Sequence, residues 1–209
     1  MWQDIQWVFL DVGSTLSDES RAYDHRIREA IAGTGISYQE FFDKMIGYYR
    51  QNQKGDIKAL EYFGLAKPVW HKEDERLYPQ AEECLRRLKQ RYRVGVIANQ
   101  SPGTEKRLQA YGVGEYIDLV ISSAEEGVAK PDPAIYRLAL DRAGCSPQEA
   151  VMVGDRLDND ILPAKELGMK TIWVRQGFSG RYYTPRREEE QPHYTAQDLT
   201  EVWRFLLGE

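Results

Sequence analysis

Near its beginning the chain contains WVFLDVGSTL, from Trp7 to Leu16, which is an apolar run, an aspartate and a Gly-Ser-Thr turn. A short run of aromatic and aliphatic residues predicts a strand that is buried on both faces. Asp11 then stands at the carboxyl end of this strand, where an aspartate often only forms a turn or caps a helix. Because backbone amides in such a turn can hold an anion, we predict an anion site here, with Ser14 and Thr15 as candidate contacts.

The rest of the chain alternates between short apolar runs and amphipathic stretches. The apolar runs predict strands at residues 94–97, 117–121, 151–153 and 171–174. The amphipathic stretches predict helices at residues 81–92, 133–143, 158–167 and 196–207. This alternation predicts an α/β fold with a parallel sheet and right-handed crossovers. Residues 177–192 are rich in Arg, Glu, Tyr and Pro and are expected to form an irregular surface segment.

Residues 17–77 break the alternation because they contain no convincing strand. Helices are predicted there at residues 20–32, 38–52, 56–64 and 68–76. The block follows the first strand, so it is an insertion at the carboxyl edge of the sheet, where open α/β folds bind ligands. We therefore predict a core domain of residues 1–16 and 78–209 and a helical cap domain of residues 17–77. The many aromatic residues of the cap are expected to fill its own core or, alternatively, to line a substrate pocket.

A second strand end carries several acids. Asp155 directly follows an apolar run, and Asp158 and Asp160 come within the next five positions. Carboxylates that lie together repel one another unless a cation sits among them, and oxygen ligands in this number suit Mg²⁺. We predict that Asp155 binds the metal, whereas Asp158 is better placed to cap the next helix.

Two further loops carry polar residues that suit a phosphate. Lys130 lies in Gly127–Pro133, where prolines stiffen the backbone, so its ammonium could neutralise phosphate charge. Asn99 and Gln100 follow the run 94–97 and precede a helix, and the beginning of a helix is a ready anion site.

As a set, these motifs resemble the haloacid dehalogenase-like (HAD) superfamily of hydrolases. The strand-end aspartate, the inserted helical cap, the asparagine after a later strand, Lys-Pro-Asp-Pro and Gly-Asp-x-x-x-x-Asp occur in the order of that superfamily. The resemblance covers nearly the whole chain. It implies an α/β fold, with a Rossmann-like parallel sheet as the HAD-like core and a small all-helical cap.

The resemblance also implies roles for individual residues in an Mg²⁺-dependent phosphatase of a small phosphorylated metabolite. Asp11 is the expected nucleophile, which forms an aspartyl-phosphate, and Lys130 stabilises charge in the transition state. The expected Mg²⁺ ligands are Asp11, the Gly13 carbonyl, Asp155 and Asp160. The expected phosphate contacts are Ser14, Thr15, Asn99, Gln100 and Lys130.

Two positions depart from the superfamily pattern. Gly13 stands where its phosphatases usually carry a second aspartate, whose general acid–base help is worth about 10²–10⁴-fold in rate. Ala98 replaces a usual Ser or Thr, which removes a phosphate hydrogen bond worth roughly 1.5–3 kcal/mol. We therefore expect an attenuated or specialised enzyme, unless a cap residue takes over the proton transfer. By proximity in sequence, Asp18, Glu19 and His25 are candidates for that role.

Three alternatives remain at this stage. The chain could be a catalytically quiet binding or regulatory protein, in which case restoring Asp at Gly13 and Ser at Ala98 should raise activity. It could cleave phosphonates, which in that branch requires a cap lysine such as Lys44, Lys54 or Lys58. It could be a dehalogenase, although dehalogenases do not need the metal that the acids predict.

Bulk properties restrict the partners. A net charge of −5 over 209 residues argues against nucleic acid or an anionic membrane as a partner. The beginning of the chain resembles neither a signal peptide nor a membrane span. Cys84 and Cys145 have no metal or redox spacing and are expected to be buried packing residues. A cytoplasmic protein, monomeric or homodimeric, is therefore expected.

Overall fold

The structure, a computed structural model, describes residue 2 and residues 4–209, so Met1 and Gln3 of the predicted core range lie outside the described residues. Its centre is a six-stranded sheet with the order β5-β4-β1-β6-β7-β8, in which all neighbours are parallel. The predicted α/β fold class is thereby confirmed. The strands are β1 (Trp7–Leu10), β4 (Arg93–Ala98), β5 (Leu119–Ser122), β6 (Ala150–Gly154), β7 (Lys170–Val174) and β8 (Tyr194–Ala196).

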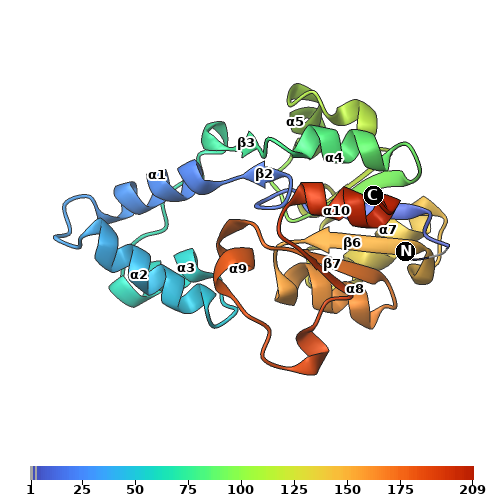
Figure 1. Cartoon of the computed structure of the whole chain (residues 1–209). Helices are drawn as coiled ribbons and strands as arrows, with labels where there is room; N and C mark the ends of the chain where they lie inside the picture. Colours follow the sequence, from blue (N-terminus) through green and yellow to red (C-terminus); the bar gives the residue numbers. More distant parts are fainter. Residues whose placement is uncertain (1, 3) are drawn as a thin grey trace.

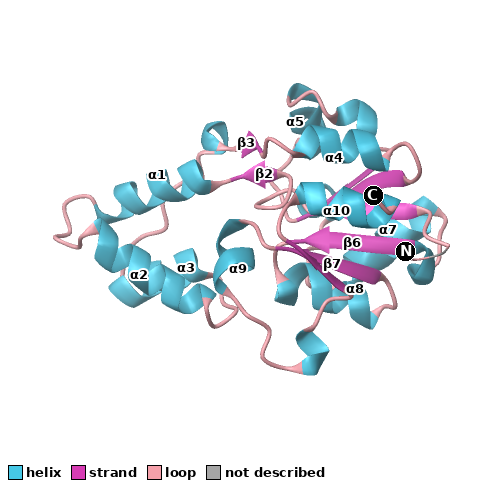
Figure 2. Cartoon of the chain, in the orientation of Figure 1, coloured by secondary structure: helices cyan, strands magenta, loops and turns pink. Residues whose placement is uncertain are grey.

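Helices cover both faces of the sheet (Figures 1 and 2). Val8 and Leu10 of β1 point into a core shared with one set of helices, whereas Trp7 and Phe9 point into a core on the opposite face. This is why all four residues of the strand are apolar. On the first face lie α4 (Ala81–Leu88), α5 (Thr104–Ala110) and α10 (Leu199–Leu207), and on the second lie α7 (Pro133–Ala143) and α8 (Leu162–Glu166).

A helical cap stands beyond the carboxyl ends of the strands, toward which the arrow of β6 points in Figure 2. It contains α1 (Ser20–Ile31), α2 (Tyr38–Tyr49) and α3 (Gly55–Phe63), which share an apolar core of their own. Two short antiparallel strands, β2 (Ser17–Asp18) and β3 (Arg76–Leu77), join it to the sheet. The sequence did not predict these strands, because two-residue strands carry no periodicity and exist only where the two connections meet.

Three other segments differ from the sequence prediction. Residues 68–76, expected to be helical, contain only a 3₁₀ turn, η1 (Lys72–Asp74), and end in β3, which pairs with β2. The helix expected at 158–167 begins as a π-helical turn, η4 (Leu157–Ile161), and continues as α8. The segment 177–192, expected to be irregular, contains helix α9 (Gly177–Tyr182).

Short elements complete the chain: η2 (Gly114–Tyr116), α6 (Ser123–Glu126), η3 (Pro147–Glu149) and η5 (Glu188–Glu190). Cys84 is buried, as expected, but Cys145 is only half-buried. Over the described residues, no helix combines the length and the apolar character needed to cross a membrane.

Candidate active site

The strand-end acids predicted from the sequence lie together. β1 and β6 are neighbours in the sheet, and the Asp11 amide donates a 2.9 Å hydrogen bond to the Val153 carbonyl. Asp155 follows β6, and Asp160 returns to the same place from η4. Oxygens of Asp11, Asp155 and Asp160 all lie within 4.8 Å of one another. The parallel arrangement of β1 and β6 thus gathers three carboxylates at one point.

Lys130 provides the positive charge of this cluster. Its Nζ donates hydrogen bonds of 2.7 Å to Asp11 Oδ1, 2.7 Å to Asp160 Oδ1 and 2.8 Å to the Ile97 carbonyl. The lysine side chain is fully buried. These three hydrogen bonds fix the orientation of the ammonium, so Lys130 in turn holds the carboxylates of Asp11 and Asp160 in place.

The cluster still has an excess of negative charge, because three carboxylates face one ammonium. Burial raises the pKa of Asp11 to about 6, although the charge of Lys130 opposes the shift. Burial, reinforced by Asp160 and Asp11, raises the pKa of Asp155 well above its usual range. No hydrogen bond from a described residue reaches the Asp155 carboxylate. A divalent cation would neutralise this excess, so the donor set fits Mg²⁺.

Gly154 allows the acids to come this close. A Cβ atom at this position would lie 2.4 Å from Cβ and 2.5 Å from Cγ of Asp160. The Asp160 side chain therefore occupies the space above the end of β6. It is held there by the Arg156 amide, which donates a 3.0 Å hydrogen bond to Asp160 Oδ2. Only glycine at the end of β6 is compatible with this position of Asp160.

Glu19 fills the space that Gly13 leaves open. A Cβ atom at Gly13 would lie 2.8 Å from Glu19 Oε1. Ser14 Oγ donates a 2.8 Å hydrogen bond to Glu19 Oε2 and holds the carboxyl in this place. Burial, with a contribution from Glu75, raises the pKa of Glu19 to about 8. A carboxyl that readily carries a proton thus lies beside the turn after Asp11, and Glu19 is one of the three acid–base candidates proposed from sequence proximity.

The two other candidates lie elsewhere. The Asp18 side chain accepts a hydrogen bond from the Ser20 amide, and His25 lies on the outside of α1 next to Asp74. Neither is among the residues that line the cavity described below. Sequence proximity alone could not separate Glu19 from them.

The predicted phosphate contacts differ in how they are placed. Gly13 and Ser14 line the cavity, but the Thr15 side chain is fully buried and does not. Thr15 Oγ1 has no hydrogen-bond partner among the described residues. The structure therefore does not bring Thr15 together with the other predicted contacts, because the turn that carries Ser14 directs the next side chain into the core.

Asn99 and Gln100 also line the cavity, but both side chains already have partners. The Asn99 amide makes two 2.8 Å hydrogen bonds with the backbone of Lys130, one to the carbonyl and one from the amide. Gln100 Oε1 accepts a 2.6 Å hydrogen bond from Lys72 Nζ of the cap. Asn99 thus holds the Lys130 loop, and Gln100 joins the core to the cap.

A cavity of about 410 Å³ lies between the acid cluster and the cap. On the core side it is lined by residues that include Asp11, Asp155, Arg156 and Asn159. On the cap side its cationic lining residues are Arg26, Lys54, Lys67 and Lys72. The volume is in the range of sites for small molecules, roughly 300–1,000 Å³. Cations on the wall opposite Asp11 favour an anionic ligand.

Arg26 is the most enclosed of these cations. Its NH1 donates a 2.6 Å hydrogen bond to Asp56 Oδ2, and its guanidinium lies 4.3 Å from the centre of the Trp70 ring. Its Nε has no partner among the described residues. This unpartnered Nε is itself buried, so Arg26 contributes to the cavity wall mainly through its ion pair with Asp56.

Helix α9 closes the cavity from the core side and was missed at the sequence level. Its Phe178 contacts Tyr23, Phe42 and Tyr49 of the cap, with ring centroids 4.9, 5.9 and 5.5 Å away. The only sequence signal was an aromatic residue after Gly177 in a polar stretch. A single apolar residue shows no periodicity, so its contact with the cap emerges only from the fold.

Comparison with known proteins agrees with this geometry. A family model for haloacid dehalogenase-like hydrolases matches residues 5–168. The chain is 29% identical over 226 aligned positions to the glyceraldehyde 3-phosphate phosphatase of Methanocaldococcus jannaschii, and the match covers 95% of each protein. It is 34% identical over 129 residues to the phosphoserine phosphatase of Thermus thermophilus, a match that covers 61% of this chain and 50% of that protein. A solved HAD phosphatase from Thermococcus onnurineus superposes with a TM-score of 0.66 at 25% identity and 98% coverage of both chains.

Proposed function

This chain belongs to the haloacid dehalogenase-like hydrolase family, and we propose that it is an Mg²⁺-dependent phosphatase of a small phosphorylated metabolite. The observation that carries the proposal is the position of Asp11, held by Lys130 in the lining of a cavity whose cap side carries cationic residues. The names of its relatives support a phosphate monoester as the substrate class.

The proposed reaction begins with attack of an Asp11 carboxylate oxygen on phosphorus. The bond between phosphorus and the leaving oxygen breaks, and an aspartyl-phosphate forms. Lys130 keeps Asp11 in place and stabilises the negative charge that gathers on the phosphoryl oxygens. Water then attacks the phosphorus of the aspartyl-phosphate, which releases phosphate and regenerates Asp11.

Mg²⁺ would be held by Asp11, Asp155, Asp160 and the Gly13 carbonyl. When bound, it supplies positive charge that offsets repulsion between the Asp11 carboxylate and the phosphate. Lys130 and the Arg156 amide each donate to one oxygen of Asp160, so this acid would support the site mainly by holding Lys130 and by its negative charge. The negative excess of the three carboxylates and the lack of a donor to Asp155 support this assignment.

Glu19 is proposed as the proton donor and acceptor that replaces the missing aspartate at Gly13. In the first step the leaving oxygen takes a proton from Glu19, and in the second step Glu19 takes a proton from the attacking water. Its carboxyl lies where a side chain at Gly13 would begin. Its raised pKa, about 8, keeps the proton available near neutral pH.

The cap wall points to a substrate with a second polar or anionic group. Lys54, Lys67 and Lys72 provide positive charge around the cavity. A volume of about 410 Å³ is large enough for a metabolite of a few carbons. Glyceraldehyde 3-phosphate and phosphoserine, the substrates in the names of two relatives, both have this character.

The experiment is a panel of phosphate monoesters and acyl phosphates, assayed for phosphate release with Mg²⁺ and with EDTA. We expect Mg²⁺-dependent turnover, and we expect Asp11→Asn to abolish it while Asp158→Asn, which alters an acid that pairs with Arg156 outside the cluster, retains it. Absence of turnover on every substrate would favour the quiet, ligand-binding alternative.

Cleavage of a phosphonate is a second candidate, because the structure distinguishes one of the three cap lysines proposed from the sequence. Lys54 lines the cavity, whereas Lys58 pairs with Glu61 and Lys44 lies over the Tyr62 ring. A Schiff base between Lys54 and an aldehyde-bearing phosphonate would be trapped by borohydride. Trapping in the unmodified protein but not in Lys54→Arg would establish this function, and its absence together with monoester turnover would exclude it.

A further inference from the structure

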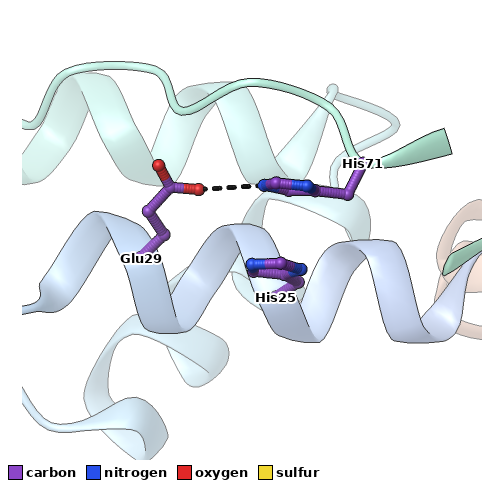
Figure 3. A group of neighbouring side chains, drawn as sticks. All are labelled: His25, Glu29 and His71. Carbon is purple, nitrogen blue, oxygen red and sulfur yellow. Dashed lines mark hydrogen bonds and ion pairs between the residues drawn. The ribbon is translucent and has the colours of Figure 1, made fainter. Parts of the chain in front are cut away.

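A second cluster of metal-binding residue types lies in the cap, away from the acids of the active site. Figure 3 shows His25 and Glu29 on α1 and His71 on the segment that precedes η1. His25 and Glu29 are four residues apart and so lie on the same face of the helix. Two of the three histidines in the chain belong to this cluster. None of its members lines the cavity of the proposed phosphatase site.

The potential ligand atoms of the three residues are close. One atom from each lies within 4.8 Å of the other two, and His71 Nε2 lies 3.3 Å from Glu29 Oε2. The two imidazole rings are stacked, with centroids 3.7 Å apart and an interplanar angle of 6°. One ring lies over the other (Figure 3), so the rings must turn out of the stack before both Nε2 atoms can bind one ion.

Each histidine is oriented by a carboxylate on its other nitrogen. Asp74 Oδ2 lies 2.8 Å from His25 Nδ1, and Glu73 Oε1 lies 2.9 Å from His71 Nδ1. With both Nδ1 atoms engaged, Nε2 is the nitrogen that each ring has left for a ligand. Carboxylates in this position orient metal-binding histidines and increase their basicity.

We propose that His25, Glu29 and His71 form a binding site for Zn²⁺ or a similar borderline divalent cation. Two imidazoles and one carboxylate are a donor set that zinc uses, with water in the remaining position. Imidazole nitrogens disfavour Mg²⁺, which prefers oxygen ligands, so the site differs in selectivity from the acid cluster beside Asp11.

The local charge favours a cation at this place. Glu29, Glu73 and Asp74 place three carboxylates around the two imidazoles. His71 lies between two of these carboxylates, so both of its nitrogens face negative oxygens. A metal ion could bind His71 Nε2 and the Glu29 carboxylate at the same time. A proton on Nε2 would only support the single contact between these two residues.

The three side chains have room to converge on a metal. Zinc–nitrogen bonds of about 2.1 Å place tetrahedral ligands roughly 3.4 Å apart, and the potential ligand atoms here lie within 4.8 Å of one another. The side chains of His25, Glu29 and His71 are 47%, 48% and 24% exposed. Rotation of these accessible side chains out of the stack would bring the ligands to that spacing.

A bound metal would join the two connections between cap and core. Helix α1 follows β2, and His71 lies five residues before β3. His71 is followed by Lys72, which donates hydrogen bonds to Glu75 and to Gln100 of the core. The site would therefore fix the base of the cap next to a residue that lines the cavity.

The test is calorimetric titration of the full chain with ZnCl₂ in the presence of saturating Mg²⁺, which occupies the acid cluster. We expect one zinc site in the unmodified protein and a loss of affinity of at least about tenfold in His71→Ala and in Glu29→Gln. His193→Ala is the matched control, because His193 contacts Thr171 and Trp2 instead of the cluster. It should bind zinc as the unmodified protein does.

Anomalous scattering from zinc-soaked crystals locates the ion directly and does not depend on whether the variants fold. A peak between His25, Glu29 and His71 is the expected result. Absence of zinc binding under saturating Mg²⁺, unchanged affinity in His71→Ala, or a peak only at the acid cluster would overturn the proposal and leave the five residues as an ion-pair cluster.

Discussion

Lys130 Nζ lies 2.7 Å from Asp11 Oδ1, although 119 positions separate the two residues in the chain. The same ammonium lies 2.7 Å from Asp160 Oδ1. The sequence indicated a lysine in a stiff loop, but only the fold shows that it is buried between two acids. Its contribution to stability and its contribution to chemistry therefore cannot be changed independently.

Lys130→Met should remove activity and lower stability together. Removing one partner of a buried ion pair typically costs about 3–5 kcal/mol, because the other charge remains buried and unpaired. Thermal unfolding and phosphate release measure the two effects, and Mg²⁺ should recover part of the stability. Lys58→Met is the control, since Lys58 is an exposed cap lysine paired with Glu61. An active Lys130→Met enzyme of normal stability would contradict the proposed role.

Glu19→Gln should affect substrates according to their leaving groups. Without a proton donor, release of an alkoxide from an alkyl phosphate should slow by about 10²–10⁴-fold. p-Nitrophenyl phosphate should be affected far less, because its leaving group is a weak base. The measurement is kcat for both substrates in the unmodified protein, in Glu19→Gln and in Glu82→Gln, which changes an exposed glutamate of α4. Equal losses on both substrates would instead indicate that Glu19 only maintains the structure.

Gly13→Asp should lower activity, although comparison of sequences suggests that it would restore a catalytic aspartate. The new Cβ would lie 2.8 Å from Glu19 Oε1, so the two side chains compete for one space. Gly13→Asp combined with Glu19→Ala removes this conflict and should be more active than Gly13→Asp alone. Steady-state rates of the single and double variants decide the question. A single variant faster than the unmodified protein would show that Glu19 has no part in proton transfer.

The stability of the metal-free protein should fall as the pH rises, and Glu19 should account for part of the fall. Burial raises its pKa from 4.5 to about 8, so the folded chain binds this proton more tightly than the unfolded chain. The favourable contribution of this proton to folding stability is complete below the unfolded pKa of 4.5. It is lost as the pH rises through the folded pKa of about 8. The side chain in Glu19→Gln remains neutral at every pH. The melting temperature of this variant in EDTA, relative to that of the unmodified protein, should therefore rise between about pH 5 and about pH 9. A constant difference across that range would be inconsistent with the raised pKa.

Phe178→Ala should loosen the contact between α9 and the cap. Each aromatic pair contributes about 0.5–1.5 kcal/mol, and Phe178 contacts three cap rings. We expect KM to rise by roughly tenfold, with a smaller change in kcat, since the acid cluster is unaltered. Tyr62→Ala is the control because Tyr62 is an aromatic residue of the cap that is 59% exposed. An unchanged KM in Phe178→Ala would place substrate binding elsewhere in the cavity.

The sequence by itself determined the fold class and the residues at the strand ends. Apolar runs of three to five residues separated by amphipathic stretches are local patterns, and they predict a parallel sheet without knowledge of distant contacts. Parallel strands present all their carboxyl ends at one edge, so the positions of Asp11 and Asp155 after two such strands are enough to predict that they lie near each other. The resemblance to the HAD superfamily supplied the expected roles.

The tertiary structure decided which side chains surround those acids. Glu19, Asp18 and His25 are equivalent by position in the chain, and only Glu19 lies beside Gly13. Thr15, by contrast, is adjacent in sequence to the site and points into the core. Phe178 reaches the cap from a segment without periodicity. These outcomes depend on side-chain direction and on contacts between residues far apart in the chain, neither of which is encoded in the spacing of residue types.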